Sequence, residues 1–198
     1  MNDPEIRALL RPHLTAGHLI EELPVGNTEG SSTQADVVHI TDDLMHGYEL
    51  KGDGDSLKRV PMQARVYGLV CDRVTFVVTS KHLARLYLPG QLPAWAGVAQ
   101  ATPEGIHFIT PALPVPTLDR TQLGALLWQT ELVAFLKAYN IKAPTRLRVW
   151  ECCDLLQNKA IPLEVLRAYV RERLVARLLD KLLNARRQRQ LLAVAERG

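Results

Sequence analysis

The segment from residue 34 to residue 79 constrains the fold more than any other part of this chain. Residues 34–41 alternate polar and apolar side chains and are rich in β-branched residues, and residues 45–51 follow after a short turn. These two segments predict neighbouring strands. A helix is expected over residues 55–70, and the unbroken apolar run at residues 74–79 predicts a strand buried on both faces of its sheet. Strands and helices that alternate in this way indicate an α/β fold.

The flanking elements give the order helix, three strands, helix and strand, followed by a hairpin. Pro111, Pro114 and Pro116 indicate a linker after the hairpin, and the chain beyond it has helical periodicity. We therefore expect a core over residues 1–112 and a helical extension over residues 113–198. The remaining expected elements are a helix at Glu5–Leu14, a strand at His18–Val25, a loop at Gly26–Thr33, a helix at Lys81–Leu88, hairpin strands at Gly97–Thr102 and Ile106–Thr110, and helices at Thr121–Tyr139, Thr145–Leu156 and Pro162–Ala195.

Charge is divided unevenly between these two parts. Residues 1–112 carry 9 Lys and Arg against 13 Asp and Glu, a net charge of −4, whereas residues 113–198 carry 15 against 8, a net of +7. An acidic core beside a basic extension suits a protein that binds a metal ion and a polyanion.

The cellular compartment is indicated by what the sequence lacks. No apolar run approaches the roughly 20 residues that a membrane span needs, and the first residues do not have the pattern of a signal peptide. The three cysteines show no C-x-x-C spacing, so we expect them to be reduced and mostly buried. A cytoplasmic protein without a membrane partner is expected.

Asp36, Glu49 and Lys51 are the candidate chemical groups of the core. Glu49 and Lys51 are two residues apart on one expected strand, so their side chains leave the same face, and Asp36 on the neighbouring strand can point to the same place. A hard cation such as Mg²⁺ prefers oxygen ligands and needs only one or two carboxylates, and it activates a bound water. Lys51 can orient that water or stabilise the developing negative charge. The set predicts phosphodiester cleavage, although the tripeptide alone also fits an exposed ion pair.

The expected helix over residues 55–70 has one polar stripe. Asp55, Arg59, Gln63 and Tyr67 are spaced four apart and therefore lie on one face. Gln63 and Tyr67 are candidates to reach the carboxylates, and Arg59 is a candidate anion anchor. In the structural alternative Asp55 caps the helix, Arg59 pairs with it and Tyr67 packs in the core.

The order of these residues resembles the PD-(D/E)XK, or restriction-endonuclease-like, nuclease superfamily. Asp36, a short hairpin, Glu49-Leu50-Lys51 and then Gln63-Ala64-Arg65-Val66-Tyr67 follow its motif order, and the Gln-x-x-x-Tyr helix is similar to that of RecB-like members. The chain departs from the pattern at Ala35, where the motif has a proline. An uncharacterised bacterial and phage family assigned to that superfamily also resembles most of the chain, most clearly at residues 47–59, 93–98 and 126–132.

The resemblance implies a restriction-endonuclease-like core that uses Mg²⁺ or Mn²⁺. A further acid on the first helix or strand would complete the metal site. The family pattern favours Glu22 over Glu21 for this position, and strand periodicity does not decide between them. By resemblance, the catalytic residues would be Asp36, Glu49, Lys51, Gln63 and Tyr67, and the metal ligands would be Glu22, Asp36 and Glu49.

Two expected helices offer basic residues to a nucleic acid. Lys58 and Arg59 stand near the start of the helix over residues 55–70, and Arg171 and Arg177 stand on the last helix. Lys and Arg side chains that neutralise phosphates supply most of the affinity in non-specific binding. The last helix also has an apolar stripe, which favours a helix packed on its neighbours or a homodimer contact over DNA binding, and a contact with a partner protein is a further alternative.

The sequence as a whole predicts a metal-dependent nuclease that hydrolyses phosphodiester bonds of DNA, with RNA left open as a substrate. One alternative is a catalytically inactive relative that binds nucleic acid through its basic half. Another is a protein of a bacterial or phage defence or repair system that docks a partner through its C-terminal helices.

Overall fold

The computed structural model describes residues 1–26, 32–142, 148–157 and 161–195, with side chains described as far as residue 189. Within these ranges the strands form one six-stranded sheet in the order β1-β2-β3-β4-β5-β6. β1, β2 and β3 are antiparallel neighbours, β3, β4 and β5 are parallel, and β5 and β6 are antiparallel. The strands are β1 His18–Gly26, β2 Ser32–Ile40, β3 Met45–Lys51, β4 Arg73–Thr79, β5 Gly97–Thr102 and β6 Gly105–Thr110.

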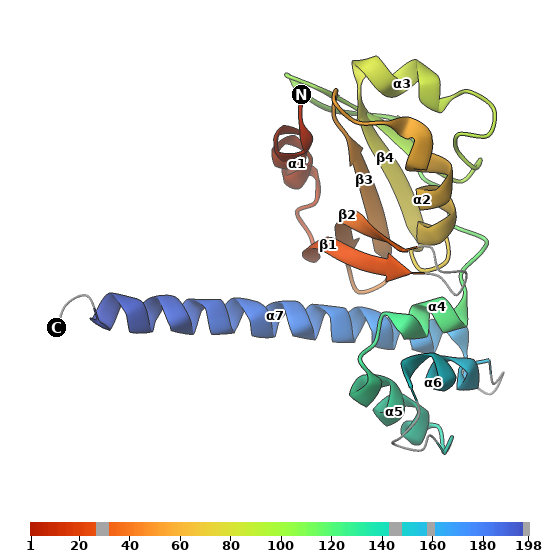
Figure 1. Cartoon of the computed structure of the whole chain (residues 1–198), viewed down its shortest axis with the longest axis vertical. Helices are drawn as coiled ribbons and strands as arrows, with labels where there is room; N and C mark the ends of the chain where they lie inside the picture. Colours follow the sequence, from red (N-terminus) through yellow and green to blue (C-terminus); the bar gives the residue numbers. More distant parts are fainter. Residues whose placement is uncertain (27–31, 143–147, 158–160, 196–198) are drawn as a thin grey trace.

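Helices cover both faces of this sheet, which makes the protein a mixed α/β protein as expected. Figure 1 shows α1 on one face, α2 on the other, and α4, α5 and α6 grouped beside the long α7. The described α-helices are α1 Asp3–Leu10, α2 Val60–Tyr67, α3 Ser80–Leu86, α4 Arg120–Ala125, α5 Gln129–Ala138, α6 Val149–Leu155 and α7 Leu163–Ala195, and the 3₁₀-helices are η1 Arg11–His13 and η2 Leu57–Arg59. The expected order of helix, three strands, helix and strand is confirmed by α1-β1-β2-β3-α2-β4.

The start of α1 is fixed by its own polar side chains. Asn2 accepts a hydrogen bond from the Glu5 N–H at 3.1 Å, and the Glu5 carboxylate accepts one from the Asn2 N–H at 2.7 Å. This reciprocal capping satisfies two N–H groups that a helix end leaves unpaired. Ile6 and Leu10, four residues apart, are buried against the sheet. The helix ends at Leu10 and continues only as the 3₁₀ turn η1, so the expected helix to Leu14 was too long.

Two longer helices of the sequence prediction are divided in the structure. The expected helix over residues 55–70 begins as η2, where the Ser56 hydroxyl accepts a hydrogen bond from the Lys58 N–H at 3.3 Å, and α2 follows with Pro61 in its first turn. The expected helix Thr121–Tyr139 is interrupted between α4 and α5, because the Glu131 carboxylate accepts from the Trp128 N–H at 2.8 Å and caps a new helix there. Most of the expected loop Gly26–Thr33 and the expected start of a helix at Thr145 lie outside the described residues.

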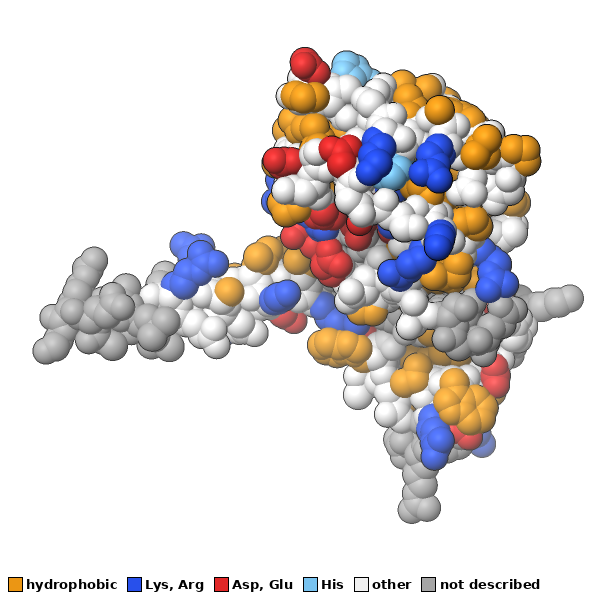
Figure 2. Space-filling view, turned by 45° about the horizontal axis from the view of Figure 1, so that its top comes forward, with side chains coloured by type: hydrophobic (Ala, Val, Ile, Leu, Met, Phe, Trp, Pro, Cys, Tyr) orange, Lys and Arg blue, Asp and Glu red, His pale blue; other side chains and the backbone are white. Residues whose placement is uncertain are grey.

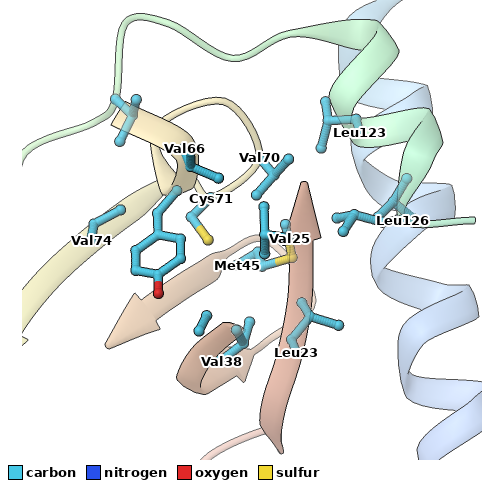
Figure 3. Close-up of a cluster of buried hydrophobic side chains, with 14 of the residues drawn as sticks. Leu23, Val25, Val38, Met45, Val66, Val70, Cys71, Val74, Leu123 and Leu126 are labelled. Atoms are coloured by element: carbon cyan, nitrogen blue, oxygen red, sulfur yellow. The ribbon is translucent and has the colours of Figure 1, made fainter. Parts of the chain in front are cut away.

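One hydrophobic cluster joins the sheet to the C-terminal helices. Leu23 and Val25 of β1, Leu123 of α4 and Leu126 directly after α4 belong to it, and Figure 3 shows these side chains pointing toward one another. Leu166, Val170 and Leu174 of α7 are part of the same cluster. The core therefore continues across residue 112. The three cysteines are free and buried, as expected.

Buried polar contacts also attach α7 to the sheet. The Asp72 carboxylate, 7% exposed, accepts a hydrogen bond from the Met45 N–H at 2.7 Å and forms an ion pair with Arg167 of α7. Leu174, Leu178 and Leu182 of α7 line a cavity together with residues of β1, and the C-terminal end of the helix extends past the sheet (Figure 1). At about 1.5 Å per residue its 33 residues span about 50 Å. No helix of the described ranges combines the length and apolar character needed to cross a bilayer.

Candidate functional site

Strand register brings three carboxylates level across β1, β2 and β3. Glu21 pairs with Val37 and Leu23 with Ala35, so Glu22 comes level with Asp36. Val37 pairs with Tyr48, so Asp36 in turn comes level with Glu49. In the described ladders neither Glu22–Asp36 nor Asp36–Glu49 is a pair, so the register brings these residues to the same level of the sheet without setting the face to which each side chain points. The separation of these residues in sequence is therefore removed by the pairing of the strands.

Glu49 is the buried centre of this row. Its side chain is 2% exposed, and its Oε1 accepts a hydrogen bond from Lys51 Nζ at 2.6 Å and another from Gln63 Nε2. Its Oε2 accepts from the Tyr67 hydroxyl at 2.6 Å. Lys51 reaches it because residues two apart on a strand share a face, and Gln63 and Tyr67 reach it because residues four apart on α2 share a stripe. A buried charge is tolerated when it is paired and hydrogen-bonded in this way.

Tyr67 and Thr33 support the inner end of the site. The Tyr67 hydroxyl lies 2.7 Å from the Gln34 carbonyl oxygen as well as near Glu49, and its single proton can go to only one of them. The Thr33 hydroxyl lies 3.3 Å from the Tyr67 hydroxyl and accepts a hydrogen bond from Arg59 Nη2 at 3.4 Å. Burial, together with the charge of Glu49, raises the pKa of Tyr67, so the phenol stays protonated.

Asp36 has a charge that the described protein only partly compensates. Its Oδ2 accepts a hydrogen bond from the Leu50 N–H at 2.7 Å, which favours the ionised form. Burial and the neighbouring charge of Glu49 act in the opposite direction and raise the pKa of Asp36 to about 7. A cation beside both carboxylates would remove the repulsion between them.

Arg7 holds the outer end of the row. Glu22 has a φ of 55°, in the left-handed region, and the β1–β2 ladder omits it. The Asp36 carbonyl at this point accepts a hydrogen bond from Arg7 Nη1 at 2.6 Å, and Glu22 pairs with Arg7 Nη2 at 2.7 Å. Glu21 instead pairs with Arg11 at 2.5 Å. Sequence reasoning missed Arg7, whose only local signal is the spacing of four residues from Asp3 on α1.

Glu22, Asp36, Glu49 and Lys51 line a polar cavity of about 220 Å³, the carboxylate cavity. Figure 2 shows acidic side chains gathered on this part of the molecule with Lys and Arg side chains beside them. Gln63, which is 3% exposed, has an Oε1 atom without a hydrogen-bond partner in the described structure. An unpaired buried acceptor is costly and indicates a donor that completes it. Among the residues that line the cavity are Asp3, Glu22, Thr33, Asp36, Glu49, Lys51, Asp55, Arg59 and Gln63.

The donor set fits a divalent cation through two carboxylates. Asp36 and Glu49 share the cavity, and Mg²⁺ binds to one or two carboxylates while it keeps several waters. Glu22 is turned to Arg7, and within the described ranges no group of three His, Cys, Asp or Glu side chains has the arrangement of a metal site. Asp36 and Glu49 could therefore hold the cation, and Glu22 would have to leave Arg7 to join them.

The expected nucleic-acid contacts are divided between two regions. Arg59 lines the carboxylate cavity, and Lys58 lines a neighbouring cavity. Arg171 lies at the other end of β2, where its Nε donates to the Asp42 carbonyl at 3.1 Å. Arg177 donates a hydrogen bond to the Leu126 carbonyl at 2.7 Å, and its guanidinium lies over the ring of Trp128, 4.9 Å from the ring centroid. Arg171 and Arg177 therefore help to pack α7 against the rest of the protein. This agrees with the alternative in which the last helix packs on its neighbours.

The fold and the site define a mixed α/β protein with a buried carboxylate–lysine cluster on two interior strands, β2 and β3, of its sheet. The chain belongs to the bacteriophage P4 protein cII family, whose model matches residues 6–193. No curated protein matches the chain. Among solved structures it is similar to SPO1766, a protein of unknown function from Silicibacter pomeroyi, with a TM-score of 0.43 and 20% sequence identity over 69% of this chain and 88% of that one. A likeness at this level carries no functional argument.

Proposed function

We propose that this protein is a metal-dependent nuclease with a restriction-endonuclease-like core, and that its carboxylate–lysine cluster hydrolyses phosphodiester bonds of DNA. The observation that carries the proposal is the convergence of Asp36, Glu49 and Lys51 on one polar cavity, with Glu49 held by Gln63 and Tyr67. These are the residues whose order in the sequence resembles the PD-(D/E)XK pattern. The order of α1, β1 to β3, α2 and β4 supports the same core.

The residues of the chain would divide the chemical work. A bound Mg²⁺ or Mn²⁺ supplies a water of lowered pKa and withdraws charge from the phosphate. Asp36 and Glu49 provide the carboxylate oxygens for that cation. Lys51, whose ammonium lies 2.6 Å from Glu49, can donate a hydrogen bond to the negative charge that develops on the phosphate. Gln63 and Tyr67 fix the two oxygens of Glu49 in place, and this preorganisation is part of what makes such a site effective.

Cleavage of DNA by the purified protein tests the proposal. Linear, circular and single-stranded DNA are incubated with the protein and Mn²⁺ or Mg²⁺, and products are separated on gels. Asp36→Asn keeps an acceptor for the Leu50 N–H, so the variant should fold, and we expect cleavage to fall by at least 100-fold. Asp43→Asn, a change of the same charge outside the cavity, is the matched control and should cleave as the wild type does.

Two results would refute the nuclease. Cleavage that survives both Asp36→Asn and Lys51→Ala would come from another site or from a contaminant. Salt-sensitive DNA binding without cleavage, indifferent to metal and to Asp36→Asn, would instead identify the protein as a non-cleaving nucleic-acid-binding protein.

A second candidate function is docking of a partner or of a second copy through α7. Leu179, Leu182 and Leu183, in the C-terminal half of α7, are 43%, 57% and 53% exposed, and Leu182 also lines a cavity with residues of β1. Contiguous exposed apolar side chains commonly mark an interaction surface. Light scattering over a range of protein concentrations separates a monomeric enzyme from a self-associating protein.

A further inference from the structure

A second cavity, of opposite charge, adjoins the carboxylate cavity. It has a volume of about 300 Å³ and is lined by residues of η2, α3 and the loop that follows α3. Three of its lining residues are the cations Lys58, Lys81 and Arg85, against one carboxylate, Asp55. Asp55 lines both cavities, so its side chain forms part of the wall of each.

The charges of this basic cavity are poorly compensated by the protein itself. Asp55 accepts a hydrogen bond from the Gly52 N–H at 2.7 Å, and Lys81 Nζ donates to the Asp53 carbonyl at 2.5 Å. Lys58 and Arg85, both exposed, have no ion pair and no side-chain hydrogen bond within the described parts of the chain. Cations that converge on one cavity without a carboxylate partner favour an anionic ligand.

A buried histidine supplies a second, independent observation. His82 lines the basic cavity and is 2% exposed, and its Nε2 donates a hydrogen bond to the Gly52 carbonyl at 3.0 Å. Its Nδ1 atom is buried and has no partner in the described structure. Gly52 follows Lys51 directly, so this histidine connects the basic cavity to the end of β3 that carries the catalytic lysine. A buried ring nitrogen without a partner calls for a ligand or water that completes it, and a phosphodiester oxygen, which can only accept, completes Nδ1 when this nitrogen carries a proton.

We propose that the basic cavity lined by Lys58, Arg85 and His82 binds a phosphate group of the DNA strand that lies in the carboxylate cavity. This inference rests on the proposed nuclease function and adds a substrate-binding subsite to it. A guanidinium and an ammonium bind phosphate oxygens by charge-assisted hydrogen bonds, and such contacts set the register of a nucleic acid on a protein. The two cavities then suit a nucleic acid with its cation: the carboxylates take the metal and the basic cavity takes a neighbouring phosphate.

Few local patterns indicate this subsite. Lys58 was expected to contact nucleic acid, but Lys81, His82 and Arg85 belong to a short helix that follows β4. The parallel pairing of β3 with β4 places the end of β4, and hence α3, beside the Gly52 turn. That proximity is a property of the sheet rather than of any local pattern.

The test is DNA binding by a variant that lacks the two uncompensated cations. Lys58→Ala combined with Arg85→Ala is compared with Lys137→Ala combined with Lys142→Ala, which removes the same charge from exposed positions elsewhere. Fluorescence anisotropy with labelled single- and double-stranded DNA is measured in EDTA over a series of salt concentrations. We expect the Lys58/Arg85 variant to bind at least tenfold more weakly at low salt, and the slope of log K against log salt to fall by about 1 to 2. The control variant should stay within about twofold of the wild type.

Inorganic phosphate separates a phosphate-binding cavity from a general charge effect. At constant ionic strength, added phosphate should weaken DNA binding by the wild type more than by the Lys58/Arg85 variant. Equal binding by this variant and the control would overturn the subsite, and equal competition by phosphate in both would do so too.

Cleavage assays run in parallel keep this inference apart from the proposed function. If the wild type cleaves DNA in a manner that depends on Asp36, but the Lys58/Arg85 variant binds as the control does, the subsite is wrong and the nuclease stands. If the wild type neither binds nor cleaves DNA, the proposed function fails and the subsite fails with it.

Discussion

Replacement of Asp36 by asparagine should stabilise the metal-free protein above neutral pH. Burial and the charge of Glu49 raise the pKa of Asp36 to about 7, although the Leu50 N–H favours its ionised form. Asparagine keeps an oxygen that can accept the 2.7 Å hydrogen bond from this N–H, and it carries no charge. The substitution therefore removes the repulsion and leaves the local geometry in place.

The gain in stability of Asp36→Asn follows from the raised pKa of Asp36. Asp36 has a higher pKa in the folded protein than in the unfolded chain, so the folded state binds more protons between the two values. The stability that comes from protonated Asp36 is fully present below pH 3.8 and is lost as the pH rises through about 7. The difference of about 3 between the two pKa values corresponds to about 4 kcal/mol. We expect about 1 to 2 kcal/mol to be measured, because the side chain is partly exposed and water screens its charge.

Urea denaturation at pH 5 and pH 8 in EDTA, followed by circular dichroism, measures this difference. The free energy of unfolding of Asp36→Asn should exceed that of the wild type, and by more at pH 8 than at pH 5. Added Mn²⁺ should stabilise the wild type, by about 2.7 kcal/mol at a concentration 100 times the dissociation constant, and should stabilise the variant much less. Asp43→Asn should have the free energy of unfolding of the wild type at both pH values, and Mn²⁺ should stabilise it as much as the wild type. The reasoning is refuted if Asp36→Asn destabilises the protein equally at both pH values, or if Mn²⁺ stabilises both proteins alike.

Three further outcomes follow from other contacts. Tyr67→Phe removes the donor to Glu49 Oε2 and should lower the free energy of unfolding by about 2 kcal/mol in urea, together with a loss of cleavage; an unchanged cleavage rate would show that this hydrogen bond does not position Glu49. Asp72→Ala leaves the buried Met45 N–H without its acceptor and Arg167 with Glu164 alone, and should cost about 2 kcal/mol in a single unfolding transition, whereas two separate transitions would mean that α7 and the sheet unfold independently. Leu182→Glu should abolish self-association in light scattering without change in circular dichroism, and a wild type that is monomeric at every concentration would rule out the homodimer.

Local patterns predicted the convergence of Lys51, Gln63 and Tyr67 on Glu49, because it depends on two simple periods. Glu49 and Lys51 share a face because the strand repeats every two residues, and Gln63 and Tyr67 share a stripe because they are four apart on α2. Asp36 meets them through the short β2–β3 hairpin, whose ladder runs from the Ile40–Met45 pair to the Val37–Tyr48 pair. The element order of the sheet and its two flanking helices could be predicted for the same reason.

What could not be predicted depends on contacts between distant segments. The pairing of Arg7 with Glu22 and with the Asp36 carbonyl joins α1, β1 and β2, and nothing near Arg7 in the sequence indicates it. Arg171 is engaged by the Asp42 carbonyl, and an arginine that packs a helix has the same local pattern as one that binds DNA. The division of the expected helix Thr121–Tyr139 depends on the Glu131 cap, which competes with a continuous apolar periodicity.

The most direct measurement is anomalous diffraction from a crystal of the protein grown or soaked with Mn²⁺. The account predicts an anomalous peak between the carboxylates of Asp36 and Glu49. A water bound to this ion should lie within hydrogen-bonding reach of Lys51. A fully soaked crystal with no peak in this cavity, or with a peak bound elsewhere while Asp36 and Glu49 remain as they are, would contradict the central claim that these two carboxylates form a metal site.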